Sequence, residues 1–152
     1  MTDDLSTIEL DQFYPHAPAK VWRALTTPAL MARWLMEPEG FEPVVGTRFR
    51  LRAKPIPATN FSGEISCEVL EAVPAKRLRI TWEDAAATVP AGWTVTWDLH
   101  PEGCGTRVVL THSGFDPDDP TAQLSRSIMR GGWPGILRRL EQALGDEASS
   151  AD

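Results

Sequence analysis

DPTAQLSRSIMRGGWPGILRRLEQAL, residues 119–144, is the stretch that decides the fold, because it predicts one long helix against which the rest of the chain must pack. The Asp119 carboxylate can accept hydrogen bonds from the free N–H groups of a first helical turn. Proline at the first helical position, here Pro120, gives up an N–H that has no partner there in any case. We therefore expect a C-terminal helix that begins at Asp119 and ends at Leu144.

This helix has one apolar side and one charged side. The apolar stripe follows helical spacing and consists of Leu124, Ile128, Trp133, Ile136, Leu137, Leu140 and Leu144. The charged residues that face elsewhere are Arg126, Arg130, Arg138, Arg139 and Glu141. Pro134 removes a backbone hydrogen bond and clashes with the preceding turn, so we expect a kink or a brief break just before Trp133. Such a bent helix fits the curve of a twisted antiparallel sheet.

The residues before the helix predict a sheet of this kind. Alternation of apolar and polar residues indicates six strands, within 5–13, 47–52, 61–73, 77–82, 92–100 and 106–113. Two short helices should follow the first strand; Pro18 opens one, and Thr27 with Pro28 caps the other. Further loops are expected at 37–46, with an extended piece at Phe41, and at 53–60 and 83–91. The predicted fold class is α+β: an antiparallel sheet against a long C-terminal α-helix.

Composition and charge indicate one soluble domain. The chain has 152 residues and a formal net charge of −6, which argues against binding to nucleic acid or to an anionic membrane surface. No leader or membrane-spanning run is seen, so we expect a cytoplasmic protein. One domain should cover 1–144, followed by a disordered acidic tail over 145–152. Cys67 and Cys104 lack the spacing of a zinc or redox motif, so we expect no metal and no other cofactor.

Several motifs in this order resemble a known family. They are Val21 to Thr26, Trp34 after Pro28, Gly46 to Phe49, Leu78 to Trp82, Gly105 to Val108, Thr111 to Phe115 and Gly132 to Leu140. Together they resemble the START-like (SRPBCC) superfamily, and most of all the branch named after the C-terminal domain of the activator of the heat-shock-protein-90 ATPase. The resemblance covers nearly the whole chain.

This resemblance implies a helix-grip fold. In that fold a curved sheet of six to seven antiparallel strands wraps around a long C-terminal helix, with two small helices after the first strand and a cavity between sheet and helix. Relatives use the cavity to hold sterols, lipids, plant hormones or polyketides, and a minority carry out cyclase or hydrolytic chemistry there. The likeness to a chaperone activator also implies a role in the stress response.

The inward faces of the predicted strands and helices are rich in large rings. The candidate ligand-binding residues are Trp34, Phe49, Phe61, Ile65, Ile80, Trp82, Trp93, Trp97, His112, Met129 and Trp133. One interpretation is an aromatic pocket for a flat or greasy ligand, with methionines as adaptable filler. The ligand would enter between the loops 53–60 and 83–91 and the N-terminal part of the last helix. The other interpretation is a solid core in which the rings pack against one another.

His112 is the one histidine that strand alternation turns inward. Imidazole titrates near neutral pH, so His112 is a weak catalytic candidate that could exchange a proton with a bound carbonyl. No carboxylate partner or nucleophile is visible beside it in the sequence, which favours a structural histidine. The sequence also contains no phosphate-binding glycine loop and no Ser-His-Asp arrangement.

Three functions remain open at this point. The first is non-enzymatic binding of a small hydrophobic or amphipathic molecule in the cavity, which should tolerate His112→Ala. The second is a co-chaperone-like interaction domain that stimulates a chaperone ATPase, with a homodimer or a chaperone as partner, and it should depend on the outer arginines. The third is a polyketide-cyclase-like or hydrolase-like enzyme that uses His112.

Overall fold

The computed structural model describes residues 5–59 and 61–150, and their side chains as far as residue 145. Its helices are α1 (Pro18–Thr26), α2 (Pro28–Trp34) and α3 (Pro120–Ser150), with a short 3-10 turn, η1 (Pro57–Thr59). Its strands are β1 (Thr7–Tyr14), β2 (Pro38–Glu39), β3 (Arg48–Arg52), β4 (Glu64–Val73), β5 (Arg77–Thr81), β6 (Glu83–Asp84), β7 (Thr94–Glu102) and β8 (Gly105–Ser113).

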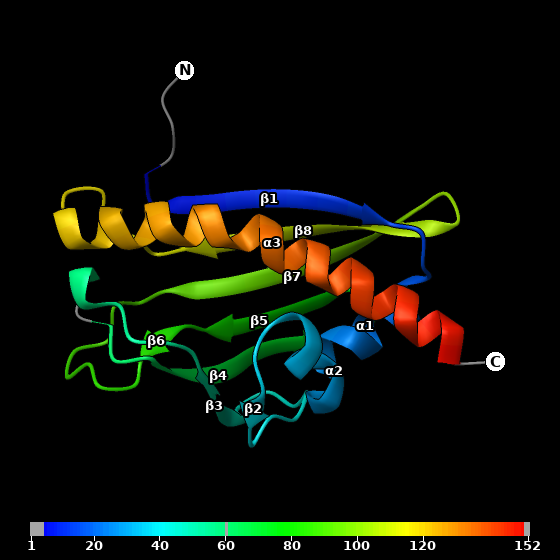
Figure 1. Cartoon of the computed structure of the whole chain (residues 1–152), viewed down its shortest axis with the longest axis horizontal. Coiled ribbons are helices and arrows are strands. Elements are labelled where there is room, and N and C mark those ends of the chain that lie inside the picture. The colour runs from blue at the N-terminus through cyan, green and yellow to red at the C-terminus, as the bar shows by residue number, and fades with distance from the viewer. Residues whose placement is uncertain (1–4, 60, 151–152) are drawn as a thin grey trace.

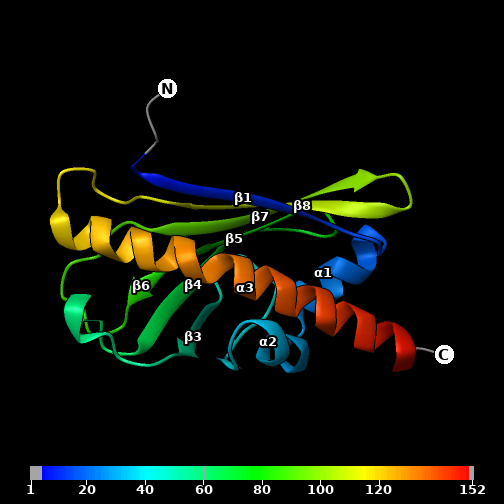
Figure 2. The ribbon, with the colours of Figure 1, turned by 45° about the horizontal axis from the view of Figure 1, so that its top comes forward.

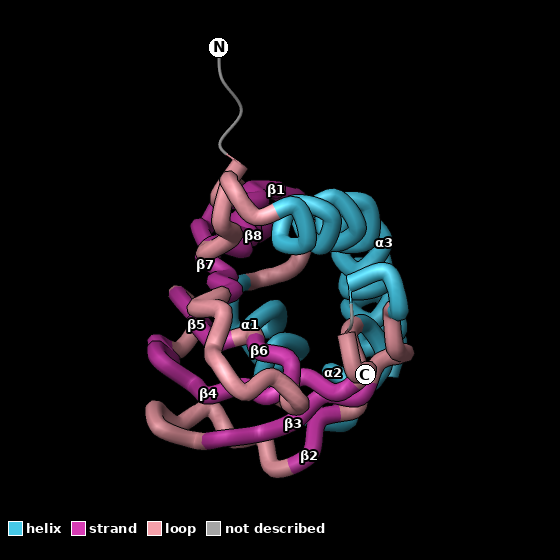
Figure 3. The backbone as a smooth tube through the Cα atoms, turned by 90° about the vertical axis from the view of Figure 1, so that its left-hand side faces the viewer, coloured by secondary structure: helices cyan, strands magenta, loops and turns pink. Residues whose placement is uncertain are grey.

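The strands form one antiparallel sheet in the order β1-β8-β7-β5-β4-β3-β2, with β6 paired to β4 off this path. Figure 1 shows α3 lying across this sheet, with α1 and α2 at one end of it. The end-on view in Figure 3 shows the strands curving around the side that α3 covers. The predicted α+β helix-grip architecture is therefore confirmed.

Two short strands were not predicted. The extended piece in the loop 37–46 lies at Pro38–Glu39, which pairs with β3, rather than at Phe41. Phe41 instead turns its ring into the core against Phe49, with centroids 4.9 Å apart. The expected loop 83–91 begins with β6, because Glu83 and Asp84 pair with β4.

The two small helices begin at the expected prolines and hold each other through one buried bond. Pro18 and Pro28 occupy the first turns of α1 and α2, and the Thr27 side chain makes no capping hydrogen bond within the described part of the chain. The indole N–H of Trp34 donates to the carbonyl of Ala24 over 2.8 Å. Figure 2 shows this pair beneath the C-terminal half of α3.

Helix α3 starts as predicted, and it ends later than expected. Asp119 Oδ1 accepts from the Thr121 backbone N–H over 3.0 Å. The helix continues without a break through Pro134, and its axis changes direction near its middle in Figure 1. It also runs to Ser150, past the expected end at Leu144. The last two residues of the predicted disordered tail lie outside the described residues, and the single-domain assignment stays a prediction.

The apolar stripe of α3 is buried along only part of its length. Trp133, Leu137, Leu140 and Leu144 are at most 2% exposed, whereas Leu124 is 42% and Ile128 is 39% exposed. Arg126, expected on the wet side, is 8% exposed. Its Nε and Nη2 both donate to the carbonyl of Thr7, over 3.1 and 2.9 Å. The reason is that β1 is an edge strand, whose outer carbonyls have no neighbouring strand to pair with.

None of the described helices is both long enough and apolar enough to cross a membrane.

Candidate functional site

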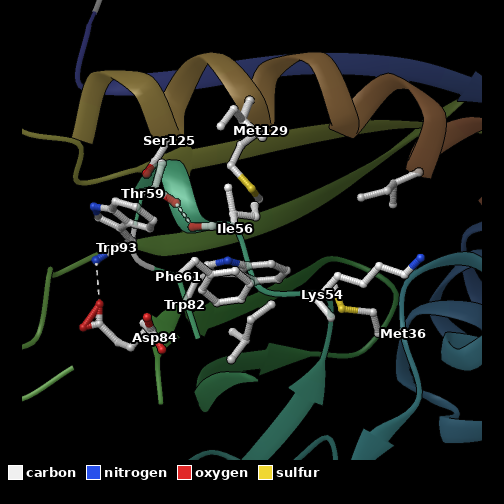
Figure 4. A pocket seen from close by; sticks show the side chains of 15 residues that line it. Met36, Lys54, Ile56, Thr59, Phe61, Trp82, Asp84, Trp93, Ser125 and Met129 are labelled. Atoms are coloured by element: carbon white, nitrogen blue, oxygen red, sulfur yellow. Dashed lines mark hydrogen bonds between the residues drawn. The ribbon is translucent and has the colours of Figure 1, made fainter. Parts of the chain in front are cut away.

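A cavity of about 390 Å³ lies between the first half and middle of α3, the loop before β4, and strands β4 and β6 with the residues beside them. This volume falls in the range of small-molecule sites, roughly 300–1,000 Å³. Figure 4 shows its side chains converging from these elements. The cavity is lined by Met36, Ala53, Lys54, Ile56, Thr59, Phe61, Ile65, Trp82, Glu83, Asp84, Trp93, Ser125, Ile128, Met129 and Ile136.

The structure divides the candidate residues into two groups. Those that line the cavity are Phe61, Ile65, Trp82, Trp93 and Met129. Those that lie in the buried core instead are Trp34, Phe49, Ile80, Trp97, His112 and Trp133. Both groups face the concave side of the sheet, so strand alternation alone could not separate them. Contact of any of these residues with a ligand stays a prediction.

Rings of the core group form a chain of contacts around Trp133, near the middle of α3. Trp34 meets Trp97 at 6.0 Å between centroids, Trp97 meets Trp133 at 6.2 Å, and Trp133 meets Trp82 at 5.5 Å. The first two pairs are edge-to-face, an arrangement that aromatic quadrupoles favour. Trp82 is thus shared between core and cavity. The solid-core and pocket interpretations each describe one end of the same interior.

His112 is enclosed by rings and does not line the cavity. Its Nδ1 accepts the indole N–H of Trp133 over 3.1 Å, and its ring centroid lies 4.7 Å from that of Phe115. Burial lowers the pKa of His112 to about 3, so the imidazole is neutral at physiological pH. With Nδ1 as acceptor, Nε2 carries the proton, and Nε2 has no hydrogen-bond partner within the described residues. His112 is therefore built into the packing, with no access to solvent.

The carboxylate of Glu83 folds the loop after β6 back onto the sheet. Its Oε1 accepts from the backbone N–H groups of Ala91 and Gly92, each over 3.1 Å, and of Trp93 over 3.4 Å. Gly92 adopts a φ of 80°, which glycine reaches without steric cost. These bonds fix the backbone that carries the Trp93 ring, so Glu83 positions one wall of the cavity.

The carboxylate of Asp84 connects the loop before β4 to the loop after β6. It accepts from the backbone N–H of Ser62 over 3.1 Å, from the Ser62 hydroxyl, and from the backbone N–H of Ala86 over 3.0 Å. Burial raises the pKa of Asp84, but the hydrogen bonds from Ser62 and Ala86 outweigh it and the net pKa is lowered. The carboxylate thus remains ionised and joins the two loops beside the cavity.

Ten of the fifteen lining residues are absent from the candidate set predicted from the sequence. Ile128 and Ile136 belong to the predicted apolar stripe, and that stripe was the signal that could have found them. Lys54 and Ile56 lie in a proline-rich loop, whose path no periodicity describes, although this loop was expected at the mouth. Ser125, a short polar residue within the helix, carried no signal at all.

The described residues include no group of three or more His, Cys, Asp or Glu side chains that could hold a metal ion.

Comparisons with known proteins agree with this fold. The sequence matches the family described as activator of Hsp90 ATPase homolog 1-like protein over residues 15–145. The crystal structure of MLL2253 from Mesorhizobium loti is 36% identical, with a TM-score of 0.78 over 92% of this chain and 97% of that one. The solution structure of BH1534 from Bacillus halodurans is 27% identical, with a TM-score of 0.70 over 91% of this chain and 96% of that one.

A third solved structure shows the same fold at lower identity. The Aha1 dimer from Colwellia psychrerythraea, solved in solution, is 22% identical with a TM-score of 0.74, over 91% of this chain and 95% of that one. Among curated proteins, no sequence matches this chain. Because the family match spans most of the sequence, the chain belongs to the family of activator of Hsp90 ATPase homolog 1-like proteins.

Proposed function

We propose that the cavity binds a small hydrophobic or amphipathic molecule reversibly and without chemical conversion. The observation that carries this proposal is the lining itself, in which rings and aliphatic side chains surround an open volume of about 390 Å³. Ile128 also stays 39% exposed on the α3 face above this volume. An apolar wall left open in this way is typical of a ligand site.

The polar groups near the cavity favour binding over catalysis. The carboxylate oxygens of Glu83 and Asp84 accept hydrogen bonds from backbone N–H and hydroxyl groups of the neighbouring loops. His112 is neutral, enclosed, and hydrogen-bonded to Trp133. A general base must reach the proton that it removes. On this geometry the enzyme hypothesis requires a rearrangement that exposes His112, and binding requires none.

Native mass spectrometry of the purified protein, followed by a titration with fatty acids, sterols and flat aromatic molecules, tests the proposal. Trp82 and Trp93 border the cavity, so their fluorescence should change in a saturable way when a ligand enters. A bound small molecule in the mass spectrum, or a saturable change, supports the proposal. If both signals were absent for every ligand class, the proposal would be overturned.

A variant that fills the cavity tests the location of the site, and a second variant on the same helix serves as its control. Met129 reaches from α3 into the space, so Met129→Trp should abolish binding, which calorimetry measures without interference from the new indole. Gln142→Trp adds the same ring to an exposed position on the same helix and should leave binding unchanged. Binding that persists in Met129→Trp would place the ligand elsewhere.

The family match favours a second candidate, an interaction domain that stimulates a chaperone ATPase. Arg130 and Arg138 are exposed on α3 and could meet an acidic partner surface. Reversal of both charges should then abolish stimulation of a purified chaperone ATPase, whereas Met129→Trp should preserve it. The relative from Colwellia psychrerythraea was solved as a dimer, so sedimentation of this chain alone tests whether it also pairs with itself.

A further inference from the structure

The polar groups that line the cavity fall into engaged acceptors and unengaged donors. The Glu83 and Asp84 carboxylates already accept from several N–H and hydroxyl groups. Lys54 and Trp82 also line the cavity, and neither the Lys54 ammonium nor the Trp82 indole N–H has a hydrogen-bond partner among the described residues. A ligand in this space therefore meets donors that lack an acceptor.

These groups also lie at different ends of the cavity. In Figure 4, Lys54 and Met36 lie together at one end, while Trp93, Ser125 and Asp84 lie towards the other. Phe61 and Trp82 lie between the two ends. The cavity is thus positively charged at one end, negatively charged at the other, and aromatic between them.

We propose that the occupant is an amphiphile with an anionic head, of the class of straight-chain carboxylates, whose head pairs with the Lys54 Nζ. Its tail lies along Phe61, Trp82 and Met129, with its far end towards Trp93. An anionic head in the opposite orientation would approach Asp84 and Glu83, and like charges repel. This assignment rests on the proposed function, because it names the class of ligand for the same cavity.

The balance of forces sets the size of the expected effect. Lys54 is exposed, so its ion pair with a head group stays in contact with water and is weak and screened by salt. Burial of the tail against the rings supplies most of the affinity, in proportion to the apolar area removed from water. The head should therefore set preference and orientation more than absolute affinity.

Three probes that share one alkyl chain and differ only in the head provide the test: decanoate, decan-1-ol and decylamine. Calorimetric titration at low salt and near-neutral pH should find decanoate tighter than decan-1-ol by about fivefold, the effect of one exposed ion pair. Decylamine should bind most weakly. Addition of salt to about 0.5 M should remove the preference for decanoate and leave decan-1-ol binding in place.

Two lysine variants connect the preference to one residue. Lys54→Met keeps an unbranched side chain and removes the charge, so decanoate binding should weaken to the level of decan-1-ol binding, and the preference for decanoate should disappear. Lys76→Met makes the same change at an exposed lysine that does not line the cavity and should keep the preference.

The outcomes separate this assignment from the proposed function. Equal binding of decanoate and decan-1-ol, or a preference that survives Lys54→Met, would overturn the head assignment and leave the binding site intact. Tighter binding of decylamine would overturn it too, and would place a cationic head at Asp84 and Glu83. No binding of any of the three would overturn the proposed binding of alkyl amphiphiles and this assignment with it.

Discussion

The two halves of α3 carry the same apolar repeat and use it for different purposes. From the middle of the helix towards its C-terminus, Trp133, Leu137 and Leu140 are almost fully buried against the sheet and the small helices. In the N-terminal half, Leu124 and Ile128 remain about two-fifths exposed. The comparison teaches that helical periodicity identifies the face of a helix that turns inward and does not reveal whether that face meets a core or a cavity.

The cause of the difference is what stands beneath each half. Helices α1 and α2 both contact α3 and fill the space at its C-terminal end. Under the N-terminal part of α3 stands the loop before β4, whose η1 turn contacts the helix. That loop is rich in proline and does not supply a continuous apolar surface, so the space between it and the sheet stays open.

The largest expected effect is that of removing the ring at the centre of the packed half. Trp133 is fully buried between Trp82 and Trp97, so Trp133→Ala should leave a void and lower the free energy of unfolding by about 3–5 kcal/mol. Urea denaturation measures this value. A loss below about 1 kcal/mol would mean that the packed half is loose as well.

The second prediction concerns the pH dependence of the packed half. The pKa of His112 is lowered from 6.5 to about 3 by burial, so between these values the unfolded chain binds a proton that the folded chain does not. Stability should therefore fall as pH decreases below about 6.5, by on the order of 1.4 kcal/mol per pH unit from this residue.

The variant His112→Gln, which keeps an acceptor for the Trp133 indole, isolates this contribution. Its free energy of unfolding should vary less between about pH 7 and about pH 5 than that of the native protein. His100→Gln, at an exposed position on β7, should leave the native dependence in place. Parallel curves for His112→Gln and the native protein would show that the buried imidazole does not govern the slope.

A smaller effect should follow from loosening the contact between α3 and β1. The Tyr14 hydroxyl donates to the carbonyl of Leu137 over 2.9 Å, and burial, aided by Glu141, raises the pKa of Tyr14 so that it remains protonated. Tyr14→Phe should lower the free energy of unfolding by about 1 kcal/mol. Gln12→Ala removes an exposed hydrogen bond between the same two elements and should cost less. A larger loss in Gln12→Ala would reverse this ranking.

The smallest effect on stability is expected in the open half. Ile128→Ala should change the free energy of unfolding by only about 0.5 kcal/mol, because the side chain is partly in water already. Binding of an apolar ligand should weaken at the same time, since Ile128 lines the cavity. Calorimetry and urea denaturation of one preparation test both parts. A stability loss comparable to that of Trp133→Ala would remove the distinction between the halves.

Much of the fold could be predicted because its signals are local. Each of these signals concerns residues that are close together in sequence: the alternation along a strand, Asp119 before Pro120, and the prolines at 18 and 28. The structure contains the elements that they predict. The burial of Arg126 could not be predicted in this way. It depends on the carbonyl of Thr7, which is distant in sequence and lies on a sheet edge that only the complete fold defines.

The cavity was predicted in outline and missed in detail for the same reason. Large rings turned inward indicated an aromatic interior, yet whether a ring packs, as Trp97 does, or borders open space, as Trp93 does, depends on what the opposite side supplies. That side is the loop containing Lys54 and Ile56, whose course follows from the bonds that Asp84 makes to Ser62. No pattern within either segment contains that information.

The position of β1 has a consequence for the newly made chain. Within the described residues β1 precedes every other strand, yet its one partner strand there is β8, where Thr7 lies opposite Ser113, and its Tyr14 hydroxyl donates to a carbonyl 123 residues later. Until β8 has been synthesised, the buried residues of β1, among them Ile8 and Tyr14, lack the strand with which they pair. Contacts this distant in sequence slow folding and prolong the exposure of unfinished edges. An unpaired strand of this kind is prone to aggregation until its partner strand emerges.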